Sequence, residues 1–147
     1  MRVHGQFRIC QPAERVLWIV VEGGINYEFA IQYSEAIQEA AHQLGPGPWI
    51  RINDIRHWDL GGPEVIPPLH DLMVWAESSG LAHSINIVSM VNLQKHMLDL
   101  MMDGVPRHSE RHLTQTLEDT FALCRKLAWD FDETKVLPLY ASETPSA

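Results

Sequence analysis

The sequence is poor in positive charge and contains no long apolar segment. Eleven Lys and Arg residues stand against nineteen Asp and Glu, so the formal net charge is −8. Nucleic-acid binding and attraction to anionic membranes both depend on basic side chains, so this balance argues against either unless charge is segregated on one face. No stretch approaches the roughly 18 apolar residues that a membrane span needs. We therefore expect neither nucleic-acid binding nor a membrane span.

Cysteine is also scarce. The two cysteines, Cys10 and Cys124, lie far apart in the chain and are expected to be reduced thiols in the core. A disulfide or a reactive thiol is the alternative. The first residues, 1–6, lack the apolar segment of a signal peptide, so a cytoplasmic location is expected.

Motifs for catalysis and cofactor binding are missing. The pairs Gly23-Gly24 and Gly61-Gly62 lack the third glycine, or the lysine and glycine spacing, of nucleotide-binding loops. The sequence therefore predicts a protein without catalysis of its own and assigns no catalytic, cofactor or metal residue. One alternative is an enzyme that uses Asp54 and His57 as an acid–base pair, with Cys10 or Ser84 approaching in space as the nucleophile.

What is present is the pattern of one globular domain. The chain has 147 residues, of which 46% are hydrophobic and 20% charged. The order of the predicted elements is β-β-α-β-α-β-α-(β)-α, which is an α/β fold with a single mixed, mostly parallel sheet that begins with a hairpin. The predicted strands are 5–11, 16–21, 49–55, 82–90 and 111–114, and the predicted helices are 26–44, 67–77, 93–103 and 117–131.

Local signals define several ends of these elements. Gly23-Gly24 is expected to end the second strand, and Asn26 and Thr116 are expected to cap the first and last helices. The domain is expected to span residues 4–131. In the remaining tail, 132–147, the apolar segment 136–140 can pack on the domain, and residues 142–147 are expected to be disordered.

Several of these segments resemble the STAS-like domains, the anti-sigma-factor antagonist fold and its relatives. The resemblance lies in the predicted hairpin, in Gly-Gly-Ile-Asn at 23–26, in Trp-Ile-Arg-Ile-Asn-Asp-Ile at 49–55, and in the last strand and capped helix at 112–120. It covers residues 4–131. The group includes small bacterial proteins that are also classed with CRAL-TRIO lipid-transfer domains, so the resemblance implies a regulatory domain or a lipid-like ligand.

One departure from that group concerns its regulatory residue. The antagonists carry a phosphorylatable Ser or Thr just after the acid that ends the central strand, and Asp54 matches that acid. Between Ile50 and Glu77 there is no Ser or Thr at all. Phosphorylation at the usual place is therefore chemically impossible in this chain.

An interaction surface is predicted where the central strand leads into the next helix. Trp58 is expected in a loop at 57–66, and Trp75 lies off the apolar face of the following helix, as interface anchors often do. Partial burial of these rings is the alternative. The residues assigned to this surface are Asp54, His57, Trp58, Asp59, Ile66 and Trp75.

A second group worth weighing is the histidine-rich segment 107–112. His108, Glu110 and His112 would share a face of a strand and could bind zinc. The flanking Arg107 and Arg111 are expected to oppose a cation, so the sequence favours a solvated loop and leaves a metal site as the alternative.

These observations favour a protein-interaction or regulatory module without catalytic activity, acting on an unidentified protein partner. The alternative is a carrier that binds a small apolar or lipid-like ligand between the sheet and its helices, with Met97, Met101 and Met102 as a pliable wall. A homodimer is expected, because two-fold association is the commonest state of small domains with an exposed apolar patch.

Overall fold

The computed structural model describes residues 5–60, 62–129 and 131–143. It confirms an α/β fold built on one five-stranded mixed sheet. In chain order the elements are β1 (Gln6–Ala13), β2 (Val16–Ile25), α1 (Tyr27–Gln43), β3 (Trp49–Leu60), η1 (Pro63–Val65), α2 (Ile66–Ser78), β4 (Leu81–Ile87), α3 (Val91–Met102), β5 (Glu110–Thr114), α4 (Leu117–Lys126), η2 (Glu133–Lys135) and η3 (Leu137–Glu143).

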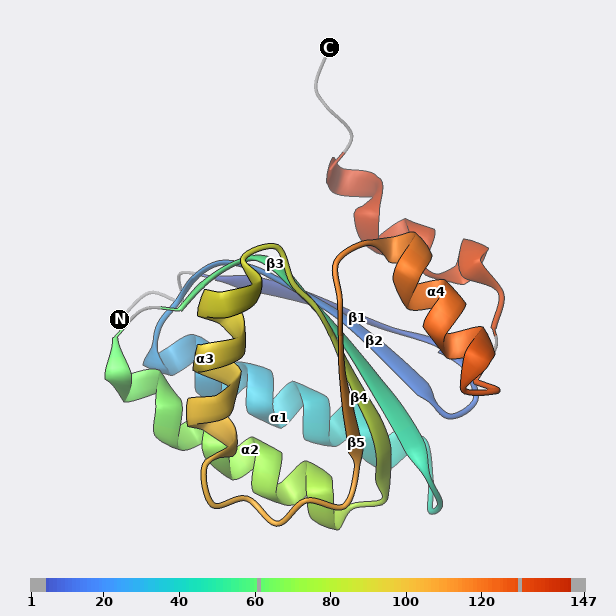
Figure 1. Ribbon diagram of the computed structural model, residues 1–147. Helices are drawn as coiled ribbons and strands as arrows, with labels where there is room; N and C mark the ends of the chain where they lie inside the picture. Colours follow the sequence, from blue (N-terminus) through green and yellow to red (C-terminus); the bar gives the residue numbers. More distant parts are fainter. Residues whose placement is uncertain (1–4, 61, 130, 144–147) are drawn as a thin grey trace.

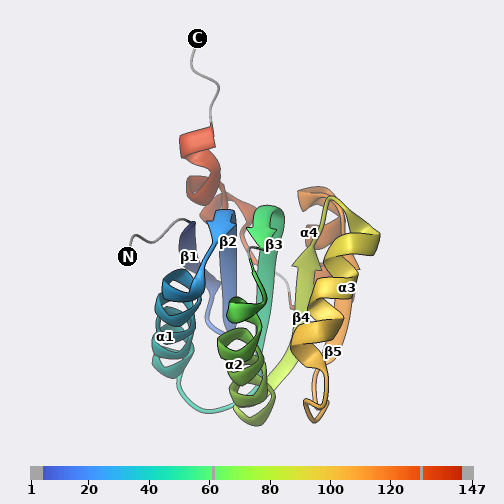
Figure 2. The same ribbon diagram turned by 90° about the vertical axis from the view of Figure 1, so that its left-hand side faces the viewer.

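The strands lie in the order β1-β2-β3-β4-β5, and only β1 is antiparallel to its neighbour. From β2 to β5, each new strand of the chain is therefore added beside the previous one at the same side of the sheet. Because βαβ crossovers are right-handed, three successive crossovers in one direction place their helices on the same face. Figures 1 and 2 show this arrangement, with α1, α2 and α3 side by side on one face of the sheet.

The opposite face is covered by α4 and the C-terminal 3-10 helices (Figure 1). A parallel strand such as β2, whose residues 16–21 are all buried, needs cover on both faces. Val136 and Leu139 supply part of that cover, since both are buried in the cluster around Trp18. The predicted docking of segment 136–140 is thus confirmed. η3 extends to Glu143, and residues 144–147, on which most of the expectation of disorder falls, lie outside the described residues.

The two predicted helix caps are present. The Asn26 side chain accepts a hydrogen bond from the backbone N–H of Phe29 at 2.9 Å. The Thr116 hydroxyl accepts one from the N–H of Asp119 at 3.0 Å. Each cap satisfies a backbone donor that the first helical turn leaves unpaired, so both helices begin where the sequence predicts.

Other predicted ends are wrong, chiefly at the strands. β2 continues through Gly23-Gly24 to Ile25 and β3 continues to Leu60, because these two extensions pair with each other in register, Gly23 opposite Trp58. Residues 57–60 are therefore strand and not loop. β4 ends at Ile87, three residues early. Helix α4 ends at Lys126 and not at 131, and Ala128 beyond it has a φ of 62°.

Among the described residues, no helix combines the length and the apolar character that crossing a membrane requires.

Candidate functional site

Buried polar side chains form a ladder on the sheet face that α1–α3 cover. Arg51 and Asn53 of β3 lie in register with Ser84 and Asn86 of β4, and all four are buried. The Asn53 amide donates to the Asn86 carbonyl oxygen at 3.2 Å, and the Tyr33 hydroxyl donates to Asn53 at 3.3 Å. Central strands of parallel sheets are normally apolar on both faces, so a polar ladder here indicates a site rather than a packing layer.

Arg51 is the member of the ladder whose hydrogen-bond donors are not all paired. The whole residue is 3% exposed. Nη2 lies 3.2 Å from the Met73 sulfur and 3.4 Å from the Ser84 hydroxyl, whereas Nε and Nη1 are buried without a hydrogen-bond partner among the described residues. Burial lowers the pKa of Arg51, and the nearby Tyr33 and Glu77 oppose that shift. Burying a charge with unmade hydrogen bonds is costly, so an acceptor in this position would stabilise the folded protein.

A cavity of about 200 Å³ opens beside Arg51, between α3 and strands β4 and β5. Most of the residues that line this cavity are either basic or apolar. The basic residues are Arg51, Lys95, Arg107 and Arg111, four of the eleven in the whole chain. The apolar residues are Met73, Leu98, Met101, Met102 and Leu113. Asp99 is the one carboxylate residue in the lining, and the Nε atom of Arg111 is buried without a partner among the described residues.

Glu77 of α2 anchors the chain segment between Arg107 and Arg111, two of the arginines that line the cavity. Its carboxylate accepts hydrogen bonds from the N–H of His108 at 2.6 Å, from the N–H of Ser109 at 2.9 Å, and from the Ser109 hydroxyl. Burial raises the pKa of Glu77, but these hydrogen bonds outweigh burial, and the net pKa is lowered. The ionised carboxylate therefore anchors the entry to β5, between Arg107 and Arg111.

We predict an acid-sensitive contribution of Glu77 to stability. Because its folded-state pKa is lowered, the contribution is present above the ordinary value of 4.5 and is lost as the pH falls through the lowered pKa. Glu77→Gln should reduce the free energy of unfolding at neutral pH by about 1–3 kcal/mol and flatten its decline in acid. Urea unfolding between about pH 3 and pH 7 measures both. Glu133→Gln is the control, because Glu133 forms an exposed pair with Arg125. If the free energy of unfolding of Glu77→Gln declined in acid as steeply as that of the wild type, the role given to Glu77 would be contradicted.

A smaller hollow of about 20 Å³ adjoins the main cavity. The two share Met73, Asn86, Leu98 and Met101 in their linings, and the hollow extends towards Trp58. Trp58 is half-buried and packs against the core. The ring predicted as an exposed anchor therefore forms part of an internal wall.

The structure does not bring the two predicted anchor rings together. Trp75 is half-buried, and its ring centroid lies 6.3 Å from that of Trp49, the first residue of β3. Trp58 lies near the other end of the same strand. The expectation of one exposed patch containing both rings is therefore wrong. His57 and Asp59 are exposed on β3, and Ile66 is half-buried at the start of α2.

Asp54 was expected on the surface, but it is 1% exposed. Its Oδ2 accepts hydrogen bonds from Arg56 at 2.6 Å and from the Tyr140 hydroxyl at 2.7 Å. Trp18 donates to the Tyr140 oxygen at 3.0 Å. Burial, followed by the Asp54 charge, raises the pKa of Tyr140. Asp54 thus pairs with Arg56 and with the C-terminal segment, not with His57.

Both cysteines are free thiols, so the alternative of a disulfide is wrong. Burial raises the pKa of Cys10 to about 11. The thiolate is the reactive form of cysteine, and a raised pKa leaves little of it at neutral pH. Cys124 is buried in the core as expected, whereas Cys10 is only half-buried.

Sequence reasoning missed the cation-lined cavity. The signal was present in two strands, where Arg51 and Asn53 alternate with isoleucines, as do Ser84 and Asn86. Such alternation is typical of a strand with one polar face. It was overlooked because a strand between helices is expected to be apolar throughout.

The order of the elements remains the basis of the resemblance to STAS-like domains. No protein-family model matches the chain, and no curated protein matches it in sequence. Membership of that group therefore stays a prediction, whereas the α/β class is shown by the sheet and its helices.

Proposed function

We propose that this protein is a binding domain without catalytic activity, a carrier or sensor for a small anion with an apolar body. The observation that carries the proposal is the Arg51 guanidinium, buried beside the cavity with two nitrogens unpaired among the described residues. A carboxylate or a phosphate would supply the missing acceptors, because guanidinium binds either group through paired hydrogen bonds.

The rest of the lining supports an amphiphilic ligand. Arg51, Arg111 and Ser84 offer donors to the charged group, while Met101 and Met102 form a wall that adapts to an apolar body. At about 200 Å³ the cavity is smaller than the pockets of about 300–1,000 Å³ that hold drug-sized molecules, so the ligand is small. This is the carrier hypothesis from the sequence, now with an anionic group.

Charge distribution adds to this argument. A protein of net charge −8 repels anions on average, yet four of its eleven basic residues gather around one cavity. A concave site lined by one sign of charge concentrates ligands of the opposite sign. The cavity is thus the place where an anion is attracted to this protein.

Calorimetric titration with octanoate, octyl phosphate and octanol tests the proposal. We expect at least one of the two anions to bind at one equivalent and octanol to bind at least tenfold more weakly, since it lacks the charge. Arg111→Met should weaken anion binding about tenfold or more, whereas Arg125→Met, whose guanidinium pairs with Glu133 outside the cavity, should not. Equal affinity for octanol, or binding of neither anion, would refute the proposal.

A regulatory role with a protein partner is the second candidate, and it is favoured by a surface on α3. Met90, Leu93 and Leu100 are large hydrophobic residues that are exposed at or on the helix that walls the cavity. Because α3 also lines the cavity, a ligand that shifts α3 would change the surface that the partner contacts. Native mass spectrometry of protein from its source distinguishes the candidates: a second polypeptide supports the partner, and a bound small molecule supports the carrier. A cytoplasmic location and a homodimer remain part of the proposal.

A further inference from the structure

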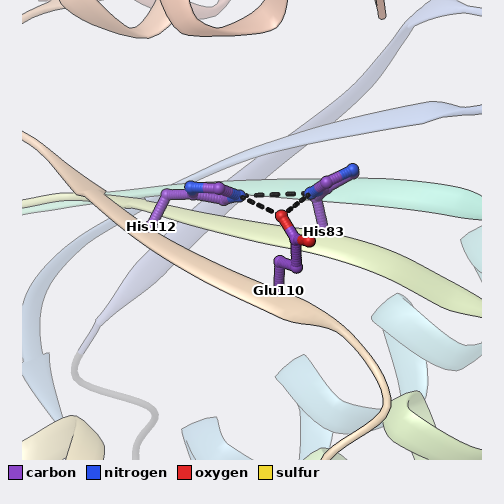
Figure 3. A group of neighbouring side chains, drawn as sticks. All are labelled: His83, Glu110 and His112. Carbon is purple, nitrogen blue, oxygen red and sulfur yellow. Dashed lines mark hydrogen bonds and ion pairs between the residues drawn. The ribbon is translucent and has the colours of Figure 1, made fainter. Parts of the chain in front are cut away.

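Three possible metal ligands meet on the sheet face opposite the cavity. His83 of β4 lies in register with Glu110 of β5, and His112 follows two residues later. Alternate residues of a strand point to the same face, so Glu110 and His112 both approach His83. Figure 3 shows the two imidazoles and the carboxylate directed towards one another.

The distances between the ligand atoms suit one metal ion. His83 Nδ1 lies 3.1 Å from His112 Nε2, and Glu110 Oε2 lies 3.7 Å and 3.9 Å from these two nitrogens. With metal–ligand bonds of about 2.0–2.1 Å, two ligands of a tetrahedral zinc ion lie about 3.3–3.4 Å apart. The three atoms therefore surround a point that an ion can occupy after shifts of a few tenths of an ångström.

We propose that His83, Glu110 and His112 form a binding site for a divalent transition-metal ion of the zinc class. Two imidazoles and one carboxylate are a recurrent zinc ligand set, with the fourth position left to water. The histidine side chains are 16% and 21% exposed and the Glu110 side chain is 72% exposed, so an ion can enter from solvent. The Trp129 ring packs edge-on against His83, with centroids 6.5 Å apart, and restricts the orientation of that imidazole.

Strand geometry weakens the electrostatic objection raised by the sequence. Arg111 alternates with Glu110 and His112 along β5, so its side chain is directed away from theirs, and both Arg107 and Arg111 line the cavity. His108, the third residue of the sequence hypothesis, is not a member of the group; its backbone N–H donates to Glu77 before β5 begins. His83, which is distant in sequence, takes its place.

An ion here would act on the edge of the sheet. It would join β5, the last strand, to β4 by side-chain ligands in addition to their backbone pairing. Arg111 lies between two of the ligands in the chain and points into the cavity. His112 also contributes to the lining of the cavity, whereas His83 and Glu110 do not, and the test of the metal site does not depend on the proposed ligand.

Zinc titration of the protein, made metal-free with a chelator, tests the proposal. We expect one equivalent of Zn²⁺ to bind in the low micromolar range or more tightly and to raise the temperature of unfolding. Glu110→Gln should weaken binding at least tenfold, and because this side chain is largely exposed, the variant should fold. His83→Ala and His112→Gln should each abolish binding.

His57→Ala and His108→Ala are the matched controls, since both histidines are exposed and lie outside the group. Each should bind Zn²⁺ like the wild type. Co²⁺ in place of Zn²⁺ should give the strong visible absorption of a four-coordinate ion, lost in Glu110→Gln. Absence of zinc binding in the wild type, undiminished binding in Glu110→Gln, or an equal loss in His108→Ala would overturn the proposal.

Discussion

Replacing Arg51 by Met should raise the free energy of unfolding of the ligand-free protein by about 1–3 kcal/mol while abolishing anion binding. The guanidinium is buried with two nitrogens unpaired among the described residues, so the folded protein bears a desolvation cost that only a bound anion would offset. Methionine fills similar volume without that cost. Urea unfolding and octanoate titration of the same sample measure the two effects.

Arg15→Met is the matched control, because Arg15 has the partners that Arg51 lacks. Its guanidinium donates to the carbonyl oxygens of Leu44 at 2.5 Å, Pro48 at 2.8 Å and Gly45 at 3.2 Å, and also to that of Gly47. Its loss should lower stability by about 1–3 kcal/mol and leave anion binding intact. If Arg51→Met were as destabilising as Arg15→Met, Arg51 would be a structural residue and the binding proposal would lose its main support.

Replacing Asp54 by Ala should lower the free energy of unfolding by about 3–5 kcal/mol. The carboxylate is buried and accepts hydrogen bonds from Arg56 and from Tyr140 of the C-terminal segment. Removing it leaves a half-buried cation and a phenol hydroxyl without their acceptor. Chemical unfolding followed by tryptophan fluorescence, to which Trp18 beside Tyr140 contributes, measures the loss.

A double-mutant cycle with Tyr140→Phe separates the hydrogen bond from general damage. Phenylalanine keeps the ring that covers the sheet and removes only the hydroxyl. Because Asp54 and Tyr140 are 2.7 Å apart, the double variant should be less destabilised than the sum of the single variants, by about 0.5–3 kcal/mol. Strict additivity, or a stable Asp54→Ala protein, would show that Asp54 does not fasten the C-terminal segment.

This role for Asp54 bears on the resemblance to STAS-like domains. In the antagonists the matching acid precedes a phosphorylated residue, whereas here Tyr140 covers the acid. In this chain Asp54 helps to hold the C-terminal segment against the sheet, and the resemblance to that group stays a prediction. The protein-interaction hypothesis based on residues 57–66 stays a prediction.

Element order and helix starts were predictable because their causes are local. The side chains of Asn26 and Thr116 each accept a hydrogen bond from the backbone N–H three residues later, so the residue types that cap these helices are visible in the sequence. The ends of β2 and β3 were not predictable from either segment alone. Gly23 and Trp58 are in strands because each extension supplies hydrogen-bond partners to the other.

By itself, the sequence determined the α/β class, the caps, the docking of the apolar C-terminal segment and the absence of Ser and Thr between Ile50 and Glu77. The tertiary structure alone brings together the residues of the two proposed sites. Strand register places Arg51 beside Ser84, and it brings His83 to His112, 29 residues away. Arg111 and His112 are adjacent in β5, so strand alternation directs their side chains to opposite faces of the sheet. Side-chain direction along a strand has a period of two, but the pairing of strands decides what each face meets.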